Sequence, residues 1–139
     1  MSEQNKALER RFVEEVWNKG NLALIDELVA PNFVDHTAPP GLPPGAEGVK
    51  AFVKMYRDAF PDAQVTIHDI LAEGDKVVYR WTGSGTHQGT LFGIPATGKK
   101  MSVDGMTIDR ISGGKFVESW NILDQLGMMQ QLGVIPKPG

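Results

Sequence analysis

The chain has 139 residues, 41% hydrophobic and 22% charged, which is enough for one domain with a buried core and too little for two. Its formal net charge is −3 and its basic residues are dispersed, which excludes the electrostatic footprint of a protein that binds nucleic acid or an anionic membrane. Cysteine is absent, and no apolar run approaches the roughly 20 residues that span a bilayer. We therefore predict a single domain over residues 1–139, located in the cytoplasm.

The first part of the chain is predicted to be helical. An apolar stripe recurs at steps of three to five residues along a helix from about residue 3 to residue 19, and its members are Leu8, Phe12, Val13, Val16 and Trp17. Gly20 is expected to end this helix, and Asn21 can cap a shorter second helix that Pro31 ends.

A stiff loop is predicted next, after a short extended segment at residues 32–36. Residues 37–46 contain four prolines and two glycines, which exclude regular structure. We expect this loop to cover the mouth of a cavity. Beyond it, residues 49–60 repeat apolar side chains at helical spacing, and Pro61 ends this third helix.

From residue 63 onward the apolar period changes to two, which predicts strands. The four strand candidates are residues 64–72, 76–88, 99–111 and 115–123. Glu73-Gly74-Asp75 and Ser112-Gly113-Gly114 predict tight turns between antiparallel neighbours. A last helical segment is predicted at residues 124–132. Helices followed by a strand meander predict an α+β fold, in which a curved antiparallel sheet and the N-terminal helices form a cone-shaped barrel around a pocket for a small apolar molecule.

The final strand has two different faces. One face contains Phe116, Glu118, Trp120 and Ile122, and the other contains Val117, Ser119, Asn121 and Leu123. The second face mixes apolar walls with short hydrogen-bonding groups, which is typical of ligand pockets. The first face is apolar enough for another subunit to cover. We predict a homodimer through this outer face, formed by Met106, Ile108, Phe116, Trp120 and Ile122.

The turn before the final strand decides which residues share the pocket face. A three-residue turn with Gly114 in the left-handed conformation places Thr107, Asp109 and Ile111 beside Ser119 and Asn121. A two-residue turn would exchange the two faces, because a slip of one residue flips every side chain. We favour the three-residue turn.

A set of short motifs resembles a known family. The set is Asn32-Phe-Val-Asp-His36, Phe60-Pro61-Asp62, Trp81, Thr86-His-Gln-Gly89, Gly93-Ile-Pro-Ala-Thr-Gly98, Gly114-Lys115 and Gln131-Leu-Gly133. Together they resemble the SnoaL-like polyketide (ester) cyclases of the NTF2-like, or ketosteroid-isomerase-like, superfamily, collinearly over nearly the whole chain. The resemblance implies the α+β barrel and a homodimer. It also implies an intramolecular aldol cyclisation of an aromatic polyketide ester, without a metal or organic cofactor.

Two positions depart from the family pattern. The resemblance implies an acid/base aspartate on the last strand and a histidine on the strand before it. A count without gaps from Gly114-Lys115 places Asn121 and Thr107 at those positions. An amide does not take up a proton near neutral pH, and a hydroxyl does not replace imidazole. The cyclase mechanism therefore does not transfer whole.

His87 is the first candidate for a catalytic residue. It matches the family's pocket-lining histidine, and imidazole changes charge near neutral pH. The alternative is a neutral histidine that is buried and bonded to the backbone. Asp35 and His36 stand together before the proline loop, where they could bind substrate or stabilise a turn.

Three further polar residues are catalytic candidates. Asp124 follows the last strand and caps a helix or acts as a base in place of Asn121. Asp109 becomes a buried acid with a raised pKa if the three-residue turn forms. Asn121 can hydrogen bond to a substrate carbonyl. The expected substrate contacts are Trp17, Tyr56, Trp81, Thr107 and Ser119. The histidines at 36, 68 and 87 lack the spacing of a metal motif, so we predict no metal and no cofactor.

Two functional hypotheses follow. The first is a cofactor-independent enzyme that performs acid/base cyclisation or isomerisation on an apolar, ring-bearing metabolite. The second is a binding or accessory protein on the same scaffold, whose acid/base pair has been lost at Thr107 and Asn121.

Overall fold

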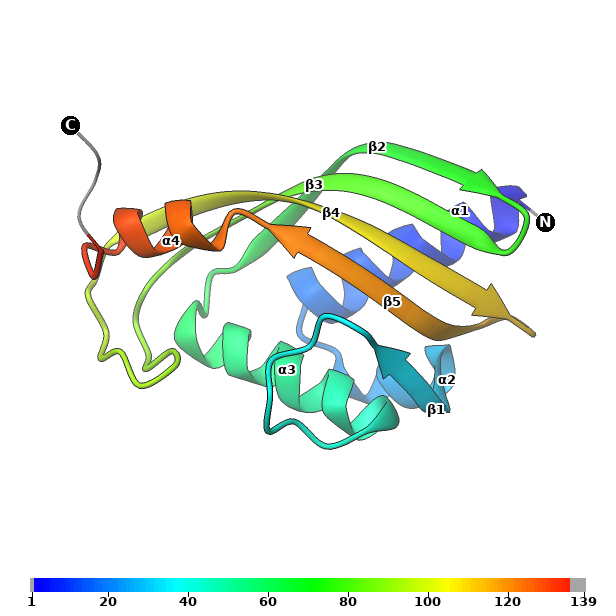
Figure 1. Ribbon diagram of the computed structural model, residues 1–139, viewed down its shortest axis with the longest axis horizontal. Helices are drawn as coiled ribbons and strands as arrows, with labels where there is room; N and C mark the ends of the chain where they lie inside the picture. Colours follow the sequence, from blue (N-terminus) through cyan, green and yellow to red (C-terminus); the bar gives the residue numbers. More distant parts are fainter. Residues whose placement is uncertain (1, 136–139) are drawn as a thin grey trace.

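The computed structural model describes residues 2–135, so the two ends of the predicted domain lie outside the described residues. It has the predicted α+β architecture: a curved five-stranded sheet whose concave side is covered by helices (Figure 1). The helices are α1 (Ser2–Phe12), α2 (Ile25–Leu28), α3 (Gly45–Ala59) and α4 (Gln125–Gln131). The strands are β1 (Val29–Asp35), β2 (Gln64–Glu73), β3 (Lys76–Thr86), β4 (Lys100–Ser112) and β5 (Lys115–Leu123).

The sheet is mixed and does not close on itself. Its strand order is β1-β5-β4-β3-β2, so β1 and β2 form the two edges. Strands β2 to β5 form the predicted antiparallel meander, whereas β1 pairs in parallel with β5. The prediction of a purely antiparallel sheet was therefore incomplete.

The predicted first helix changes its hydrogen-bond pattern halfway. Helix α1 ends at Phe12, and residues Val13–Asn18 continue as a π-helical segment, η1. The side chain of Asn18 fastens the end of η1 to strand β2, because it accepts a hydrogen bond from Val65 N (2.7 Å) and donates one to Val65 O (3.1 Å). Trp17 lies within this π-helical segment, and such turns are frequent at functional sites.

Two apolar clusters hold the helices on the sheet. The first lies under α1, α2 and β1 and includes Val16, Ile25, Val53 and Phe116. The second lies at the opposite end, beneath α4, and includes Phe60, Leu91, Met128 and Leu132. Between them the concave side is only partly filled. No helix within residues 2–135 is long and apolar enough to cross a lipid bilayer.

The hairpin between β4 and β5 corrects the predicted turn. Ser112 pairs with Lys115, and both Gly113 (φ 59°) and Gly114 (φ 76°) have positive φ, so the connection is a two-residue type I′ turn. A β-bulge follows immediately, because Ile111 pairs with Phe116 and Arg110 pairs with Glu118, which leaves one extra residue on β5.

The bulge restores the predicted pocket face and moves one residue across the sheet. Thr107 pairs with Asn121 and Asp109 pairs with Ser119, so these four side chains share the inner face as predicted. Phe116 was predicted on the outer face, but it is buried on the inner face at 3% exposure. Val117, predicted on the inner face, is the unpaired residue of the bulge.

Candidate functional site

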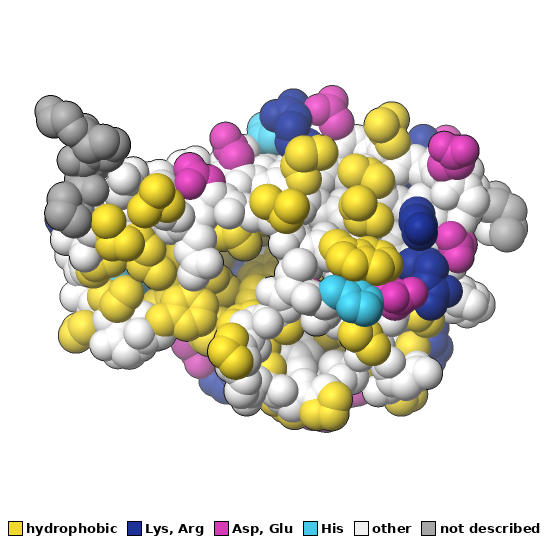
Figure 2. Space-filling view, in the orientation of Figure 1, with side chains coloured by type: hydrophobic (Ala, Val, Ile, Leu, Met, Phe, Trp, Pro, Cys, Tyr) yellow, Lys and Arg dark blue, Asp and Glu magenta, His cyan; other side chains and the backbone are white. Residues whose placement is uncertain are grey.

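The main cavity lies between the concave face of the sheet and helix α3. Its volume is about 320 Å³, at the lower end of the range for small-molecule sites. The proline loop forms part of its wall through Pro39, Leu42, Pro43 and Pro44, as predicted. Apolar side chains form most of the rest, including Phe12, Val29, Phe33, Val49 and Phe52. Figure 2 shows that this face of the molecule is hollowed, with hydrophobic side chains at the bottom of the recess.

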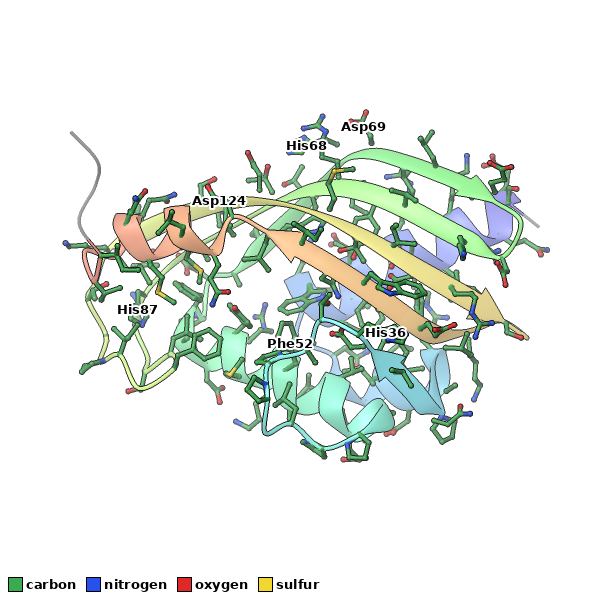
Figure 3. All side chains as sticks on the ribbon, in the orientation of Figure 1. His36, Phe52, His68, Asp69, His87 and Asp124 are labelled. Carbon is green, nitrogen blue, oxygen red and sulfur yellow. The ribbon has the colours of Figure 1, made fainter. Side chains whose placement is uncertain are left out.

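A smaller cavity of about 110 Å³ adjoins the main one. Five residues line both cavities, namely Trp17, Phe52, Tyr79, Thr107 and Asn121. The edge of the Trp17 ring faces the Phe52 ring, with the ring centroids 5.9 Å apart, so these two rings stand at the boundary between the cavities. Figure 3 shows Phe52 on the side of α3 that faces the sheet.

A pair of carboxyl groups lies at the closed side of the main cavity. Asp109 lines this cavity at 7% exposure, and Glu9 of α1 lies behind it at 0% exposure. Among the described residues, no N–H or hydroxyl donor reaches either oxygen of Glu9, and the carboxyl of Asp109 is its hydrogen-bond partner. A hydrogen bond between two carboxyl groups needs one proton, so the pair retains a proton while the fold is intact.

Burial sets the acidity of this pair. The pKa of Glu9 is raised well above its ordinary value by desolvation, and the charge of Asp109 and the shared hydrogen bond raise it further. The pKa of Asp109 is raised by desolvation, although hydrogen bonds from Glu9 and Ser119 oppose the rise. Glu9 is therefore the protonated partner, and it donates to the carboxylate of Asp109. The buried phenol of Tyr79 stands close to both acids, and desolvation together with the negative charge of this carboxyl pair raises its pKa.

A directional hydrogen-bond chain ends at Asp109. Trp81 Nε1 donates to Thr107 Oγ1 (3.0 Å), and Thr107 donates to Asn121 Oδ1 (2.6 Å). The amide nitrogen of Asn121 donates to Ser119 Oγ (3.1 Å), and Ser119 donates to Asp109. Because a carboxylate can only accept, Ser119 gives its hydrogen to Asp109 and accepts from the Asn121 amide nitrogen. This turns Asn121 Oδ1 toward the hydroxyl of Thr107, which donates to it.

The position of Trp81 depends on a glycine in the neighbouring strand. A Cβ atom at Gly105 would lie 2.3 Å from the Trp81 ring, so any side chain there would displace the indole. Gly105 therefore holds open the space in which the indole reaches Thr107.

Comparison with known proteins identifies the family of the chain. The model of the SnoaL-like polyketide cyclase family matches residues 7–132. The chain belongs to the SnoaL-like polyketide cyclase family. Among solved structures it is similar to TsrD from Streptomyces laurentii, with 32% identity, a TM-score of 0.88, and coverage of 96% of this chain and 97% of that one.

Two further solved structures are similar to this chain. A candidate polyketide cyclase from Bacillus cereus is 35% identical, with a TM-score of 0.81 and coverage of 95% of this chain and 82% of that one. IdmH, a candidate polyketide cyclase from Streptomyces antibioticus, is 33% identical, with a TM-score of 0.79 and coverage of 94% and 99%. No curated protein matches the chain. These similarities support the predicted family and its NTF2-like fold.

The two departures from the SnoaL-like pattern face each other in the structure. Thr107 and Asn121 are cross-strand partners whose side chains hydrogen bond directly. They occupy the two positions at which the resemblance implies an acid/base pair. In this chain the titratable group is Asp109 instead. It belongs to the next inward-facing pair of the hairpin, in which its cross-strand partner is Ser119.

Asp35 and His36 point in different directions. Asp35 lines the main cavity, and its Oδ1 accepts hydrogen bonds from the backbone N–H (2.9 Å) and the hydroxyl (2.8 Å) of Thr37. His36 lies against the outer face of the sheet, where Nε2 contacts Glu118 at 2.8 Å and the ring stacks on Trp120. The structure therefore brings Asp35 to the site, whereas His36, labelled in Figure 3, lies outside both cavities.

His87 lines neither cavity. It is fully buried beside the Phe60 ring, and its Nδ1 contacts Thr97 Oγ1 (3.0 Å) and accepts a hydrogen bond from Thr97 N (3.3 Å). Figure 3 places it near the end of α3 that lies away from the main cavity. Its contacts match the alternative that the sequence left open, a buried histidine bonded to a backbone N–H.

Asp124 also lies outside both cavities. It is the N-cap of α4, and its Oδ1 accepts a hydrogen bond from Gly127 N at 2.9 Å. This is the capping role that the sequence analysis weighed against catalysis. Among residues 2–135, no three His, Asp or Glu side chains gather as a metal site.

The aromatic candidates all line a cavity. Trp17 lines both, whereas Tyr56 and Trp81 line the smaller one. Burial raises the pKa of Tyr56 to about 12, so its phenol stays neutral. Thr107 lines both cavities and Ser119 lines the main one.

Glu9 is the residue that sequence reasoning missed. Its signal was present, because Glu9 precedes Val13 by four residues and Val16 by seven and therefore lies on the apolar stripe of the first helix. An acid on a buried stripe needs a partner, which makes it a candidate for function. The sequence alone did not indicate that the partner is Asp109, 100 residues further along the chain.

Proposed function

We propose that the protein is a SnoaL-like enzyme that removes a proton from the carbon next to a carbonyl group in an apolar, ring-bearing metabolite, with Asp109 as the general base. The observation that supports this is the carboxyl of Asp109 in the wall of an apolar cavity, hydrogen bonded from behind by Glu9. A base with a raised pKa suits proton transfer near neutral pH. Neither a metal nor an organic cofactor is part of the proposal.

Asp109 is held as an oriented carboxylate. The hydroxyl of Ser119 and the protonated carboxyl of Glu9 both donate to it. Asp35 lines the same cavity, and its charge contributes to the raised pKa of Asp109. A carboxylate that is desolvated and fixed in this way is a stronger base than one in water, and it stays directed at the cavity.

Asn121 supplies the complementary hydrogen bond. Its amide nitrogen uses one hydrogen for Ser119, and no described residue accepts the second, while the side chain lines both cavities. A carbonyl oxygen bound there would gain a hydrogen bond as negative charge develops on it. Oxyanion donors of this kind contribute about 10²-fold or more to the rate.

The proposed reaction is an aldol-type ring closure or an isomerisation. Asp109 accepts the proton from the carbon, and the C–H electron pair moves onto the carbonyl oxygen as an enolate. In ring closure the enolate carbon bonds to a second carbonyl carbon of the same molecule, and Asp109 returns its proton to the new alkoxide. In isomerisation the proton returns to another carbon of the enolate.

Deuterium exchange tests the first chemical step without knowledge of the full substrate. The purified protein is incubated in D₂O with 1-naphthylmethyl methyl ketone or a naphthyl 3-oxo ester. Loss of the signal of the methylene next to the carbonyl on the ring side is followed by NMR. We expect exchange above the buffer rate, and at least a 10²-fold loss in Asp109→Asn. Asp104→Asn is the matched control, because Asp104 lies on the same strand but is exposed.

The results separate two functions. Exchange that survives Asp109→Asn contradicts the proposed base. Binding without exchange favours the second candidate, a binding or accessory protein, which Thr107 and Asn121 at the acid/base positions support. In that case the double variant Thr107→His, Asn121→Asp should gain activity that the native chain lacks.

A further inference from the structure

The smaller cavity differs chemically from the main one. Its walls are almost entirely apolar and come from α3, the start of β2, the three strands after it and α4. They include Tyr56, Phe60, Ala63, Val65, Trp81, Met101, Val103, Leu123 and Met128. No Asp, Glu, His, Lys or Arg among the described residues lines it, whereas Asp35 and Asp109 both line the main cavity.

The two cavities meet at the hydrogen-bonding pair of the site. Thr107 and Asn121 line both, as do the rings of Trp17 and Phe52. Thr107 uses its hydroxyl hydrogen for Asn121 and receives the Trp81 indole. The junction therefore offers a ligand the free amide hydrogen of Asn121, beside the phenol of Tyr79, which also lines both cavities. A carbonyl oxygen bound by Asn121 therefore has one substituent on the side of each cavity.

We propose that the smaller cavity is a subsite for a short, unbranched, apolar arm of the substrate, attached to the same carbonyl whose other substituent enters the main cavity. The inference rests on the proposed function and specifies its substrate class: a ketone or ester with a ring system on one side and an alkyl or acyl arm on the other. The reacting carbon is on the side of the main cavity, because Asp109 lies there. The arm does not react, and its burial determines which chain length binds.

Two substitutions fill the smaller cavity without touching the main one. A Cβ at Gly83 would lie 3.3 Å from Trp81 Cζ3 and 3.7 Å from Val103 Cγ1, so Gly83→Ala adds a methyl group that needs only a small shift of the indole. Val103→Leu adds a methylene from the neighbouring strand. Val49→Ile is the matched control, because Val49 lines only the main cavity.

The test measures affinity against arm length. A series of 1-naphthylmethyl n-alkyl ketones, from methyl to hexyl, is titrated into the wild type and the variants by calorimetry. In these ketones an exchangeable methylene lies on the ring side of the carbonyl. In the wild type the dissociation constant should fall about fourfold for each added methylene until the cavity is full. In Gly83→Ala and Val103→Leu the fall should stop about one methylene earlier. In Val49→Ile every ketone should weaken by the same factor, with the preferred length unchanged.

Several results would overturn the subsite. The first is an affinity that does not depend on arm length, and the absence of binding by any ketone counts as this result. The second is a preferred arm length that neither Gly83→Ala nor Val103→Leu changes. The Asp109→Asn variant tests the proposed base independently of the subsite. It should show the same dependence of affinity on arm length as the wild type and should lose deuterium exchange. A wild type that selects arm length without catalysing exchange would support the subsite and contradict the base.

Discussion

The carboxyl groups of Glu9 in helix α1 and Asp109 in strand β4 hydrogen bond to each other at the wall of the main cavity. Both side chains are buried, and Ser119 is the other donor to Asp109. An unpaired carboxylate in such a place would be costly, and the shared proton avoids that cost. The pair therefore links the proposed base in the sheet to the first helix.

The pair predicts a pH-dependent stability that Glu9→Gln removes in part. In the unfolded chain Glu9 loses its proton near its ordinary pKa of 4.5, whereas in the folded protein its raised pKa retains the proton. Above pH 4.5 the folded state then binds more protons than the unfolded state, so the free energy of unfolding falls as pH rises until the raised pKa is reached. In Glu9→Gln this fall should be shallower by about 1.4 kcal/mol per pH unit.

Urea unfolding between pH 5 and pH 8 measures this difference. Glu73→Gln is the control, because Glu73 is an exposed residue at the end of β2. Equal slopes in the wild type and Glu9→Gln would show that the carboxyl pair does not retain the proton.

Substitutions at Asp124 should change the stability of the protein and leave catalysis unchanged. Asp124→Ala removes the acceptor for Gly127 N and should lower the free energy of unfolding by about 1 kcal/mol. Asp124→Asn retains a side-chain oxygen and should cost much less. Both variants should keep the wild-type rate of deuterium exchange, and a rate that falls in Asp124→Asn at unchanged stability would return Asp124 to the mechanism.

Substitution of His87 should lower the stability of the protein and leave deuterium exchange intact. His87→Ala removes a fully buried ring and leaves the partly buried backbone N–H of Thr97 without its acceptor, which should lower the free energy of unfolding by about 1–3 kcal/mol. His87→Asn is the milder variant, since an amide oxygen can replace Nδ1 as the acceptor. Exchange should persist in both. If His87→Asn folds normally but catalyses no exchange, His87 is a catalytic residue after all.

The outer face of the sheet predicts self-association. Met106, Ile108 and Ile122 are 53%, 38% and 77% exposed on this face, beside the His36–Trp120 stack. We propose that a second copy of the chain covers them. Light scattering at micromolar concentration should give a dimer for the wild type and a monomer for the double variant Ile108→Lys, Ile122→Lys.

Phe116 supplies the internal control for that experiment. Because it faces the core rather than the outer surface, Phe116→Leu should lower the free energy of unfolding by about 1–2 kcal/mol and leave the dimer intact. A wild type that is monomeric at these concentrations would contradict the interface.

The sequence was informative where structure depends on neighbouring residues. The four strands of the meander were predicted with bounds close to those observed, because alternation of apolar residues and turn-forming glycines are local signals. The capping role of Asp124 was among the predicted alternatives, because a short polar side chain before a helix has a local partner. The proline loop was placed at the cavity for a similar reason, since its composition excludes regular structure.

The site depended on relationships that no local pattern specifies. The turn at Gly113-Gly114 and the bulge beside Phe116 each shift the register by one residue, and only their combination places Asp109 inside and Phe116 with it. His36 and Asp35 are adjacent in sequence and lie on opposite faces because consecutive residues of an extended chain point in opposite directions.

What the sequence by itself determined is the family, the α+β class and the four strands of the meander. The tertiary structure alone decided that Glu9 is the partner of Asp109, that His87 lies away from the cavities, and that two cavities meet at Asn121. The physical reason is that hydrogen-bond and charge partners are selected by proximity in the fold. The side chain of Glu9 in helix α1 is close to Asp109 in β4 because the curved sheet wraps around this helix.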